Sequence, residues 1–141
     1  MMSTQRMINI LLIEDNPGDV RLTQEAFKEG RMSVNLDVVM DGDQAIKYLN
    51  KRAHYAASTT PDLILLDLNL PKMDGREVLE EIKSDPILKR IPVVVLTTSN
   101  AEQDVLKSYN LHVNCYINKP VDFDKLFDII QKIEDFWLST A

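Results

Sequence analysis

The stretch LILLDLNLPKMDG, residues 63–75, combines an apolar run with a turn signal, and this pattern predicts the fold. Its first four residues are apolar, Asp67 follows them directly, and Pro71 and Gly75 mark a turn before an amphipathic segment. A short, uniformly apolar run is typical of a strand that helices cover on both faces, and Pro and Gly are strong signals of a turn. We therefore expect a buried strand, a loop and a helix, with Asp67 directly after the strand.

The same alternation of an apolar run and an amphipathic stretch occurs five times along the chain. Strands are predicted at residues 8–13, 34–40, 63–66, 93–96 and 113–117. Helices are predicted to begin near Pro17, Asp43, Gly75, Ala101 and Asp122. Because strands that alternate with helices indicate βαβ units, the expected fold class is α/β, with five helices around a doubly wound, five-stranded parallel sheet.

The composition is that of one globular domain. The chain has 141 residues, of which 45% are hydrophobic and 27% charged, and this is enough for a single core. We expect residues 1–141 to form a single domain, with no room for an output domain after the fifth helix. The segment at residues 52–61 is long for a loop, and we expect it to be mobile rather than catalytic.

The charge and the hydropathy exclude several classes of protein. There are 16 basic against 22 acidic residues, a net charge of -6, which argues against binding to nucleic acid or to an anionic membrane. No apolar run approaches the roughly 20 residues of a membrane helix. The polar N-terminus MMSTQRM also lacks the apolar core of a signal peptide. We therefore expect a cytoplasmic protein.

Polar side chains lie at the ends of four of the five predicted strands. They are the pair Glu14 and Asp15, then Asp67, Thr97 and Lys119. The carboxyl ends of parallel strands meet at one edge of the sheet, where open α/β folds bind ligands. Three carboxylates gathered at that edge would repel one another, so the sequence predicts a divalent cation among them.

Magnesium takes oxygen ligands and usually combines one or two carboxylates with water. Asp15 and Asp67 can supply the carboxylates, Glu14 can bind directly or through water, and the backbone carbonyl of Asn69 is a further candidate ligand. The alternative is that Glu14 and Asp15 are solvated residues at a strand end, with Asp15 or Asn16 capping the next helix.

Asp67 and Lys119 together indicate a reaction. A carboxylate after a buried run, beside two other acids, is costly unless a cation and a lysine offset its charge. A carboxylate held beside a metal, with a lysine and a hydroxyl ready to receive phosphoryl oxygens, is equipped to attack phosphorus. The product would be an aspartyl phosphate.

These residues resemble the pattern of a known family. Glu14-Asp15, Asp67, Thr97 and Lys119-Pro120 are similar to the corresponding positions of bacterial two-component response-regulator receiver domains, over residues 7 to 138. The stretches LILLDLNLPKMDG, LTTSN, NCYINKP and IEDFWL are most similar to stand-alone regulators paired with cyanobacterial phytochrome histidine kinases. The resemblance implies the flavodoxin-like strand order 2-1-3-4-5.

The resemblance also implies a role for each residue. Asp67 would accept a phosphoryl group from a sensor histidine kinase, with Mg²⁺ held at the acidic cluster. Thr97 and Lys119 would contact the phosphoryl oxygens, and Tyr116 would turn inward as Thr97 moves; the alternative for Tyr116 is an ordinary half-buried tyrosine. The signal would pass through the fourth helix, the last strand and the last helix. No enzymatic activity is expected beyond self-phosphorylation and autodephosphorylation.

The expected partners are a sensor histidine kinase, with a phytochrome as the narrower expectation, and a second copy of the chain. Phe136 and Trp137 are adjacent on the last helix, so both cannot face the core, and one can extend an apolar patch. We therefore expect a homodimer through the C-terminal strand and helix.

Three alternative functions differ in specific residues. An enzyme of the haloacid dehalogenase type needs a second Asp two residues after the nucleophile, where this chain has Asn69. A flavodoxin-like cofactor binder needs phosphate-binding amides after the first strand, where this chain has EDNPGD. A receiver-like interaction module that works without phosphorylation remains the third alternative.

Overall fold

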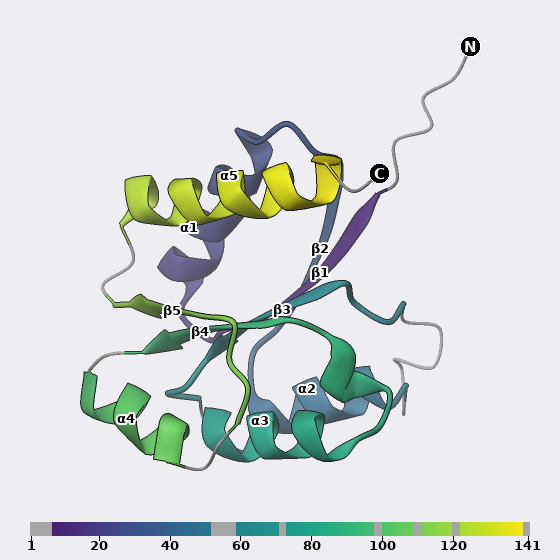
Figure 1. The fold of residues 1–141 in the computed structure, drawn as a ribbon, viewed down its shortest axis with the longest axis vertical. Helices are drawn as coiled ribbons and strands as arrows, with labels where there is room; N and C mark the ends of the chain where they lie inside the picture. Colours follow the sequence, from purple (N-terminus) through teal and green to yellow (C-terminus); the bar gives the residue numbers. More distant parts are fainter. Residues whose placement is uncertain are drawn as a thin grey trace.

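Five parallel strands form the centre of the structure, in the order β2-β1-β3-β4-β5 that the family resemblance implies (Figure 1). The computed structural model describes residues 7–51, 59–70, 73–97, 100–108, 111–119 and 122–139. The strands are β1 Ile8–Ile13, β2 Val34–Val39, β3 Leu63–Asp67, β4 Val93–Thr97 and β5 Cys115–Asn118. The helices are α1 Pro17–Lys28, α2 Gly42–Leu49, α3 Gly75–Ser84, α4 Asn100–Ser108 and α5 Phe123–Ser139, with a short 3-10 helix η2 at Leu88–Arg90.

Helices cover both faces of the sheet. Figure 1 shows α1 and α5 on one face and α2, α3 and α4 on the other. Successive strand residues point to opposite faces, so Leu11 and Ile13 of β1 pack toward α2 and α3, whereas Ile10 and Leu12 pack toward α1 and α5. Burial on both faces explains why the strands are almost uniformly apolar. The predicted α/β fold class is confirmed.

Several predicted boundaries were wrong by one or two residues. β3 and β4 include Asp67 and Thr97, because the hydrogen-bonded ladder continues through these polar residues: Asp67 pairs with Leu96, and Thr97 with Asn118. β2 ends at Val39 rather than at residue 40, and α2, α4 and α5 begin one residue away from the predicted starts. Each of these differences lies at the end of an element, where capping and pairing decide the boundary.

The last strand differs most from its prediction. It was expected at residues 113–117 and is observed at Cys115–Asn118. Asn114 itself lies in a bend, and its side-chain oxygen, rather than a backbone carbonyl, accepts a hydrogen bond of 3.0 Å from the N–H of Val93. Regular pairing with β4 therefore begins only at Cys115, opposite Val94.

Capping residues decide where the helices begin. Asn16 is the N-cap of α1 and accepts a hydrogen bond of 3.0 Å from the N–H of Asp19. Asp41 and Asp74 cap α2 and α3 in the same way. Asn16 therefore performs the capping that the sequence left open between Asp15 and Asn16, and the carboxylate of Asp15 is available for another role.

Two predictions depend on residues that the structure does not describe. Residues 52–58 of the predicted 52–61 loop lie outside the described part of the chain, and so do the side chains of Phe136 and Trp137. Among the helices that are described, none combines the length and the apolar character that a membrane span requires.

Candidate functional site

Four of the predicted site residues meet at the carboxyl edge of the sheet. Glu14 directly follows β1, Asp67 ends β3 and Thr97 ends β4, and all three are almost completely buried. Asp15 is exposed beside them. One carboxylate oxygen from each of Glu14, Asp15 and Asp67 lies within 4.8 Å of the others. The strand ends thus bring the acids together, as expected for parallel strands.

Lys119 follows β5 and reaches across to this cluster. Its Nζ lies 2.9 Å from Oδ2 of Asp67, 3.1 Å from Oε2 of Glu14 and 3.1 Å from Oδ2 of Asp19. Asp19 was missed by the sequence reasoning, although its position in the first turn of α1 is a signal for placement beside the end of β1. In the described part of the chain, three carboxylates therefore lie within 3.1 Å of a single ammonium.

The surroundings of Glu14 make its ionised form costly. Burial, reinforced by the neighbouring carboxylate of Asp67, raises the pKa of Glu14 to about 7. Its Oε2 is buried and, within the described residues, accepts no hydrogen bond of regular geometry, although Lys119 Nζ is 3.1 Å away. A divalent cation would offset this excess of negative charge, so the residues present fit a metal site.

The ionised form of Lys119, unlike that of Glu14, is stabilised by its surroundings. Burial by itself would lower the pKa of its ammonium, but the hydrogen bonds and charges of Asp67 and Glu14 outweigh burial and hold that pKa above its ordinary value. Lys119 is therefore positively charged at neutral pH. A fixed positive charge at this position can balance the oxygens of a phosphoryl group.

Asp67 is held in one orientation by both of its oxygens. Oδ1 accepts a hydrogen bond of 2.9 Å from the N–H of Asn69, and Oδ2 accepts one from Lys119. Asn69 therefore contacts Asp67 through its backbone N–H. That the backbone carbonyl of Asn69 is a metal ligand stays a prediction. The short loop after β3 thus fixes the direction of a carboxylate that is almost completely buried.

Gly75 explains how α3 can begin so close to this loop. Its N–H donates to the carbonyl of Leu68 at 3.1 Å. A Cβ at position 75 would lie 2.4 Å from Cα of Leu68 and 2.6 Å from the carbonyl oxygen of Asp67. Only glycine fits here, so this position fixes the backbone that carries Asp67.

Thr97 faces a residue that the sequence reasoning did not identify. Its hydroxyl donates a hydrogen bond of 2.5 Å to Oε1 of Glu102, which lies in the first turn of α4. An acidic residue in the first turn is a common feature of helices, so nothing in the sequence distinguished Glu102 from an ordinary helix-terminal acid. In this structure the threonine hydroxyl is thus directed to α4.

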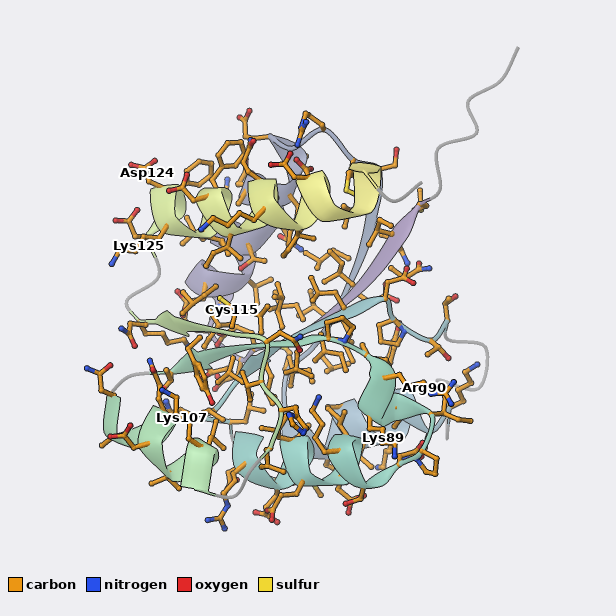
Figure 2. All side chains as sticks on the ribbon, viewed as in Figure 1. Lys89, Arg90, Lys107, Cys115, Asp124 and Lys125 are labelled. Atoms are coloured by element: carbon orange, nitrogen blue, oxygen red, sulfur yellow. The ribbon has the colours of Figure 1, made fainter. Side chains whose placement is uncertain are left out.

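Tyr116 lies apart from the acidic cluster. It is half-buried on β5 and packs against the core beneath α4, and burial raises its pKa. Nζ of Lys107 lies 5.6 Å from the centre of its ring, a cation–π contact. Figure 2 shows Lys107 on α4, on the side of the sheet that also carries α2 and α3.

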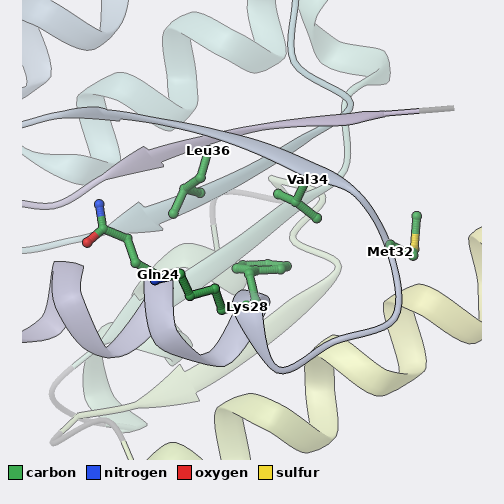
Figure 3. Close-up of a pocket in the computed structure, with 6 residues that line it drawn as sticks. Gln24, Lys28, Met32, Val34 and Leu36 are labelled. Atoms are coloured by element: carbon green, nitrogen blue, oxygen red, sulfur yellow. The ribbon is translucent and has the colours of Figure 1, made fainter.

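The groove in Figure 3 lies elsewhere, between α1 and β2. Its volume is about 310 Å³, and it is lined by Gln24, Phe27, Lys28, Met32, Val34 and Leu36. None of these residues belongs to the acidic cluster. The chemistry therefore belongs to the edge formed by the strand ends rather than to this groove.

Known proteins share both the sequence and the fold. The family model described as response regulator receiver domain matches residues 10–131. Response regulator Rcp1 from Synechocystis sp. is 55% identical over 132 residues, which cover 94% of this chain and 90% of Rcp1.

Two solved structures are similar over almost the whole chain. The phosphorylated cyanobacterial phytochrome response regulator RcpA is 57% identical, with a TM-score of 0.83, and the match covers 96% of this chain and 97% of RcpA. The Mn²⁺-bound form of response regulator Rcp1 is 54% identical, with a TM-score of 0.81, and the match covers 95% of this chain and 96% of Rcp1.

Proposed function

The chain belongs to the response regulator receiver domain family, and from this premise we propose that Asp67 is its phosphoryl acceptor. The observation that supports this most directly is the position of the Asp67 carboxylate, 2.9 Å from the ammonium of Lys119 and within 4.8 Å of the carboxylates of Glu14 and Asp15. A nucleophile, a fixed positive charge and a candidate cation site therefore occupy one edge of the sheet.

The transfer step follows from this arrangement. A carboxylate oxygen of Asp67 attacks the phosphorus of a phosphohistidine on a sensor histidine kinase. A P–O bond forms, the P–N bond breaks, and its electron pair returns to the imidazole nitrogen. Lys119 is placed to balance the phosphoryl oxygens, and Thr97 is the second proposed contact to them.

The proposed cofactor is Mg²⁺. Its ligands would be Glu14, Asp15, Asp67 and the backbone carbonyl of Asn69. When bound, it would neutralise negative charge on the phosphoryl oxygens. The Mn²⁺-bound form of Rcp1 supports a divalent cation in a relative, and the under-neutralised carboxylate of Glu14 supports one here.

The chemistry of the chain is limited to its own phosphorylation cycle. In a second step water attacks the phosphorus, the bond between Asp67 and phosphorus breaks, a proton is released to solvent, and inorganic phosphate leaves with the carboxylate regenerated. Between these steps the phosphoryl group would rearrange Thr97 and Tyr116 and change the surface formed by α4, β5 and α5.

The proposal includes the partners and the setting. The kinase would belong to the phytochrome class, which the similarity to RcpA supports, and a homodimer would form through β5 and α5. We also propose that residues 1–141 act as a single receiver domain in the cytoplasm, where a phosphohistidine donor is formed from ATP, and without nucleic acid as a ligand.

Labelling with a small phosphodonor tests this proposal. Wild type, Asp67→Asn and Asp124→Asn are incubated with acetyl phosphate and Mg²⁺, and the adduct is detected by intact mass. Asp124→Asn is the matched control, because Asp124 is exposed on α5 (Figure 2). We expect a base-labile adduct on wild type and on the control, and none on Asp67→Asn. Equal labelling of all three variants would contradict the assignment, and no labelling of wild type would favour the phosphorylation-independent alternative.

A further inference from the structure

We propose that Glu102 is a positioning residue that holds the hydroxyl of Thr97 away from the phosphoryl site and so sets how readily the domain responds to phosphorylation. This inference rests on the proposed function, because it concerns the same threonine. The inference adds Glu102, a residue on α4 that opposes the movement of Thr97 toward the phosphoryl group. The observation behind it is the hydrogen bond from Oγ1 of Thr97 to Oε1 of Glu102.

Thr97 is the donor in the hydrogen bond to Glu102. Thr97 is completely buried at the end of β4, and Glu102 is half-buried in the first turn of α4. An ionised carboxylate only accepts hydrogen bonds, so the threonine supplies the hydrogen. Hydrogen bonds to an ionised group are about twice as strong as neutral ones. The hydroxyl therefore has a preferred direction, toward α4, before any phosphoryl group is present.

A phosphoryl group competes for the same hydrogen. A hydroxyl carries one donor hydrogen, and phosphoryl oxygens, like the carboxylate, act as acceptors. Thr97 therefore cannot donate to both Glu102 and the phosphoryl group, and one charged acceptor has to replace the other. The Thr97–Glu102 bond has to break before Thr97 can donate to a phosphoryl oxygen, so the strength of that bond opposes the movement of the threonine.

The surroundings allow Glu102 to release the hydroxyl. Glu102 lines a cleft of about 340 Å³ between the loop after β3 and α4, and Asn69 and Arg76 are among the other lining residues. A carboxylate that loses the hydroxyl there still borders this open cleft, which Arg76 also lines. Breaking the bond therefore does not leave an isolated, buried charge, which would be costly.

The bond is also part of the attachment of α4 to the sheet. Nε2 of Gln103 donates to Oδ1 of Asn118 at 2.9 Å, and Lys107 lies over the ring of Tyr116. Helix α4 thus contacts the two proposed switch residues, Thr97 through Glu102 and Tyr116 through Lys107. Release of Thr97 would loosen one end of the helix while the contacts to β5 persist, which couples the phosphoryl site to a helix of the proposed signalling surface.

The affinity for beryllofluoride with Mg²⁺, a mimic of the phosphoryl group, tests the proposal. Glu102→Ala removes the acceptor, and Glu102→Asp keeps the charge but shortens the side chain by one methylene. We expect both variants to bind the mimic on the order of fivefold more tightly than wild type, because one hydrogen bond no longer competes. Asp104→Asn is the matched control: it removes one negative charge from an exposed position of the same helix, and we expect wild-type affinity.

The same substitutions are then made in a Thr97→Ala background. If Glu102 acts through Thr97, replacing Glu102 changes the affinity no further in that background. An equal gain with and without Thr97, or wild-type affinity in Glu102→Asp, would overturn the proposal in favour of a general effect of charge. Weaker binding by Glu102→Ala would also overturn it. Failure of wild type to bind the mimic at all would instead contradict the proposed function, so the two failures are distinguishable.

Discussion

Nζ of Lys119 lies 2.9 Å from Oδ2 of Asp67 and 3.1 Å from Oε2 of Glu14, so a single lysine balances the two buried carboxylates of the site. Removing one partner of a buried ion pair leaves the other charge uncompensated, which is strongly destabilising. The same ammonium is the proposed partner of the phosphoryl oxygens. Lys119 therefore has one role in folding and a second role in the reaction.

Lys119→Met separates these two roles. We expect the free energy of unfolding of the metal-free protein to fall by about 2 kcal/mol, because Asp67 and Glu14 lose their counter-charge. Added Mg²⁺ should restore part of this loss, whereas the labelling rate with acetyl phosphate should stay at least about tenfold below wild type. Urea unfolding with and without Mg²⁺ measures the first effect, and intact mass measures the second.

The control for this prediction is Lys125→Met. Lys125 is exposed on α5 and is labelled in Figure 2. An exposed lysine contributes little to stability, so this variant should unfold and label like wild type. A Lys119→Met protein that is as stable as this control without metal would contradict the charge-balancing role.

Gly75→Ala tests whether close packing at the start of α3 positions Asp67. The added methyl group would meet the backbone of Leu68 and Asp67 at 2.4 and 2.6 Å, and backbone cannot move aside as a flexible side chain can. We expect a loss of about 2–4 kcal/mol in the free energy of unfolding. Labelling should also be slower under conditions where the variant is still folded.

The comparison variant is Gly18→Ala. The nearest atom to an added Cβ there is Oδ1 of Asn16 at 3.2 Å, in the exposed N-cap side chain that precedes α1, so the contact is with a side chain and not with backbone. Alanine also favours helix over glycine, so this substitution should change stability by less than about 1 kcal/mol. Equal losses in the two variants, measured by urea unfolding, would show that the contact at Gly75 has no special role.

The sequence predicted the fold and the membership of the site for one physical reason. Apolar runs define buried strands, and parallel strands carry whatever follows them to the same edge of the sheet. The sequence alone therefore places Glu14, Asp67 and Lys119 together. Among the strands, the predicted ends failed at β3 and β4 because pairing continues into a polar residue, Asp67 or Thr97, and the predicted start of β5 failed at Asn114, whose side chain takes the place of a backbone partner.

Contacts between side chains on different elements could not be predicted in this way. Glu102 follows Thr97 by five residues, and only the path of the chain into α4 brings the two side chains together. Glu134 lies on the buried side of α5 and accepts hydrogen bonds from the backbone N–H groups of Arg31 and Met32, a hundred residues earlier. Helical periodicity indicates that position 134 faces the core, but it cannot indicate which donors meet it there.

The acid stability of the segment around η2 depends on Asp85. Its Oδ1 accepts hydrogen bonds from the N–H groups of Ile87 and Leu88, at 2.8 and 3.0 Å, and these lower its pKa from the ordinary value of 3.8. A carboxylate with a lowered pKa stabilises the folded state above its ordinary pKa, and this stabilisation is lost as the pH falls through the lowered value. Asp85→Asn should therefore melt at a lower temperature than wild type at pH 7, with the difference shrinking as the pH falls below 3.8 and through the lowered pKa of Asp85. A difference in melting temperature that stays constant throughout this acid titration would contradict this role of the charge.

Asp15→Asn tests whether the exposed acid of the cluster serves the metal rather than the fold. Because Asn16 provides the cap of α1, Asp15 has no capping role, and its exposed side chain should contribute less than about 0.5 kcal/mol to the stability of the metal-free protein. One of its oxygens nevertheless lies within 4.8 Å of oxygens of Glu14 and Asp67, so its loss should weaken Mg²⁺ binding by about tenfold or more. Titration with Mg²⁺ while the melting temperature is followed measures both effects, because the melting temperature without metal reports the stability of the fold and its dependence on Mg²⁺ concentration reports the affinity.

The matched control is Asp43→Asn, which removes one negative charge outside the cluster. Asp43 is at a half-buried position in the first turn of α2, and this variant should keep wild-type affinity for Mg²⁺. If Asp15→Asn lowered the metal-free melting temperature and left the Mg²⁺ dependence unchanged, Asp15 would belong to the fold and the metal would depend on Glu14 and Asp67 alone.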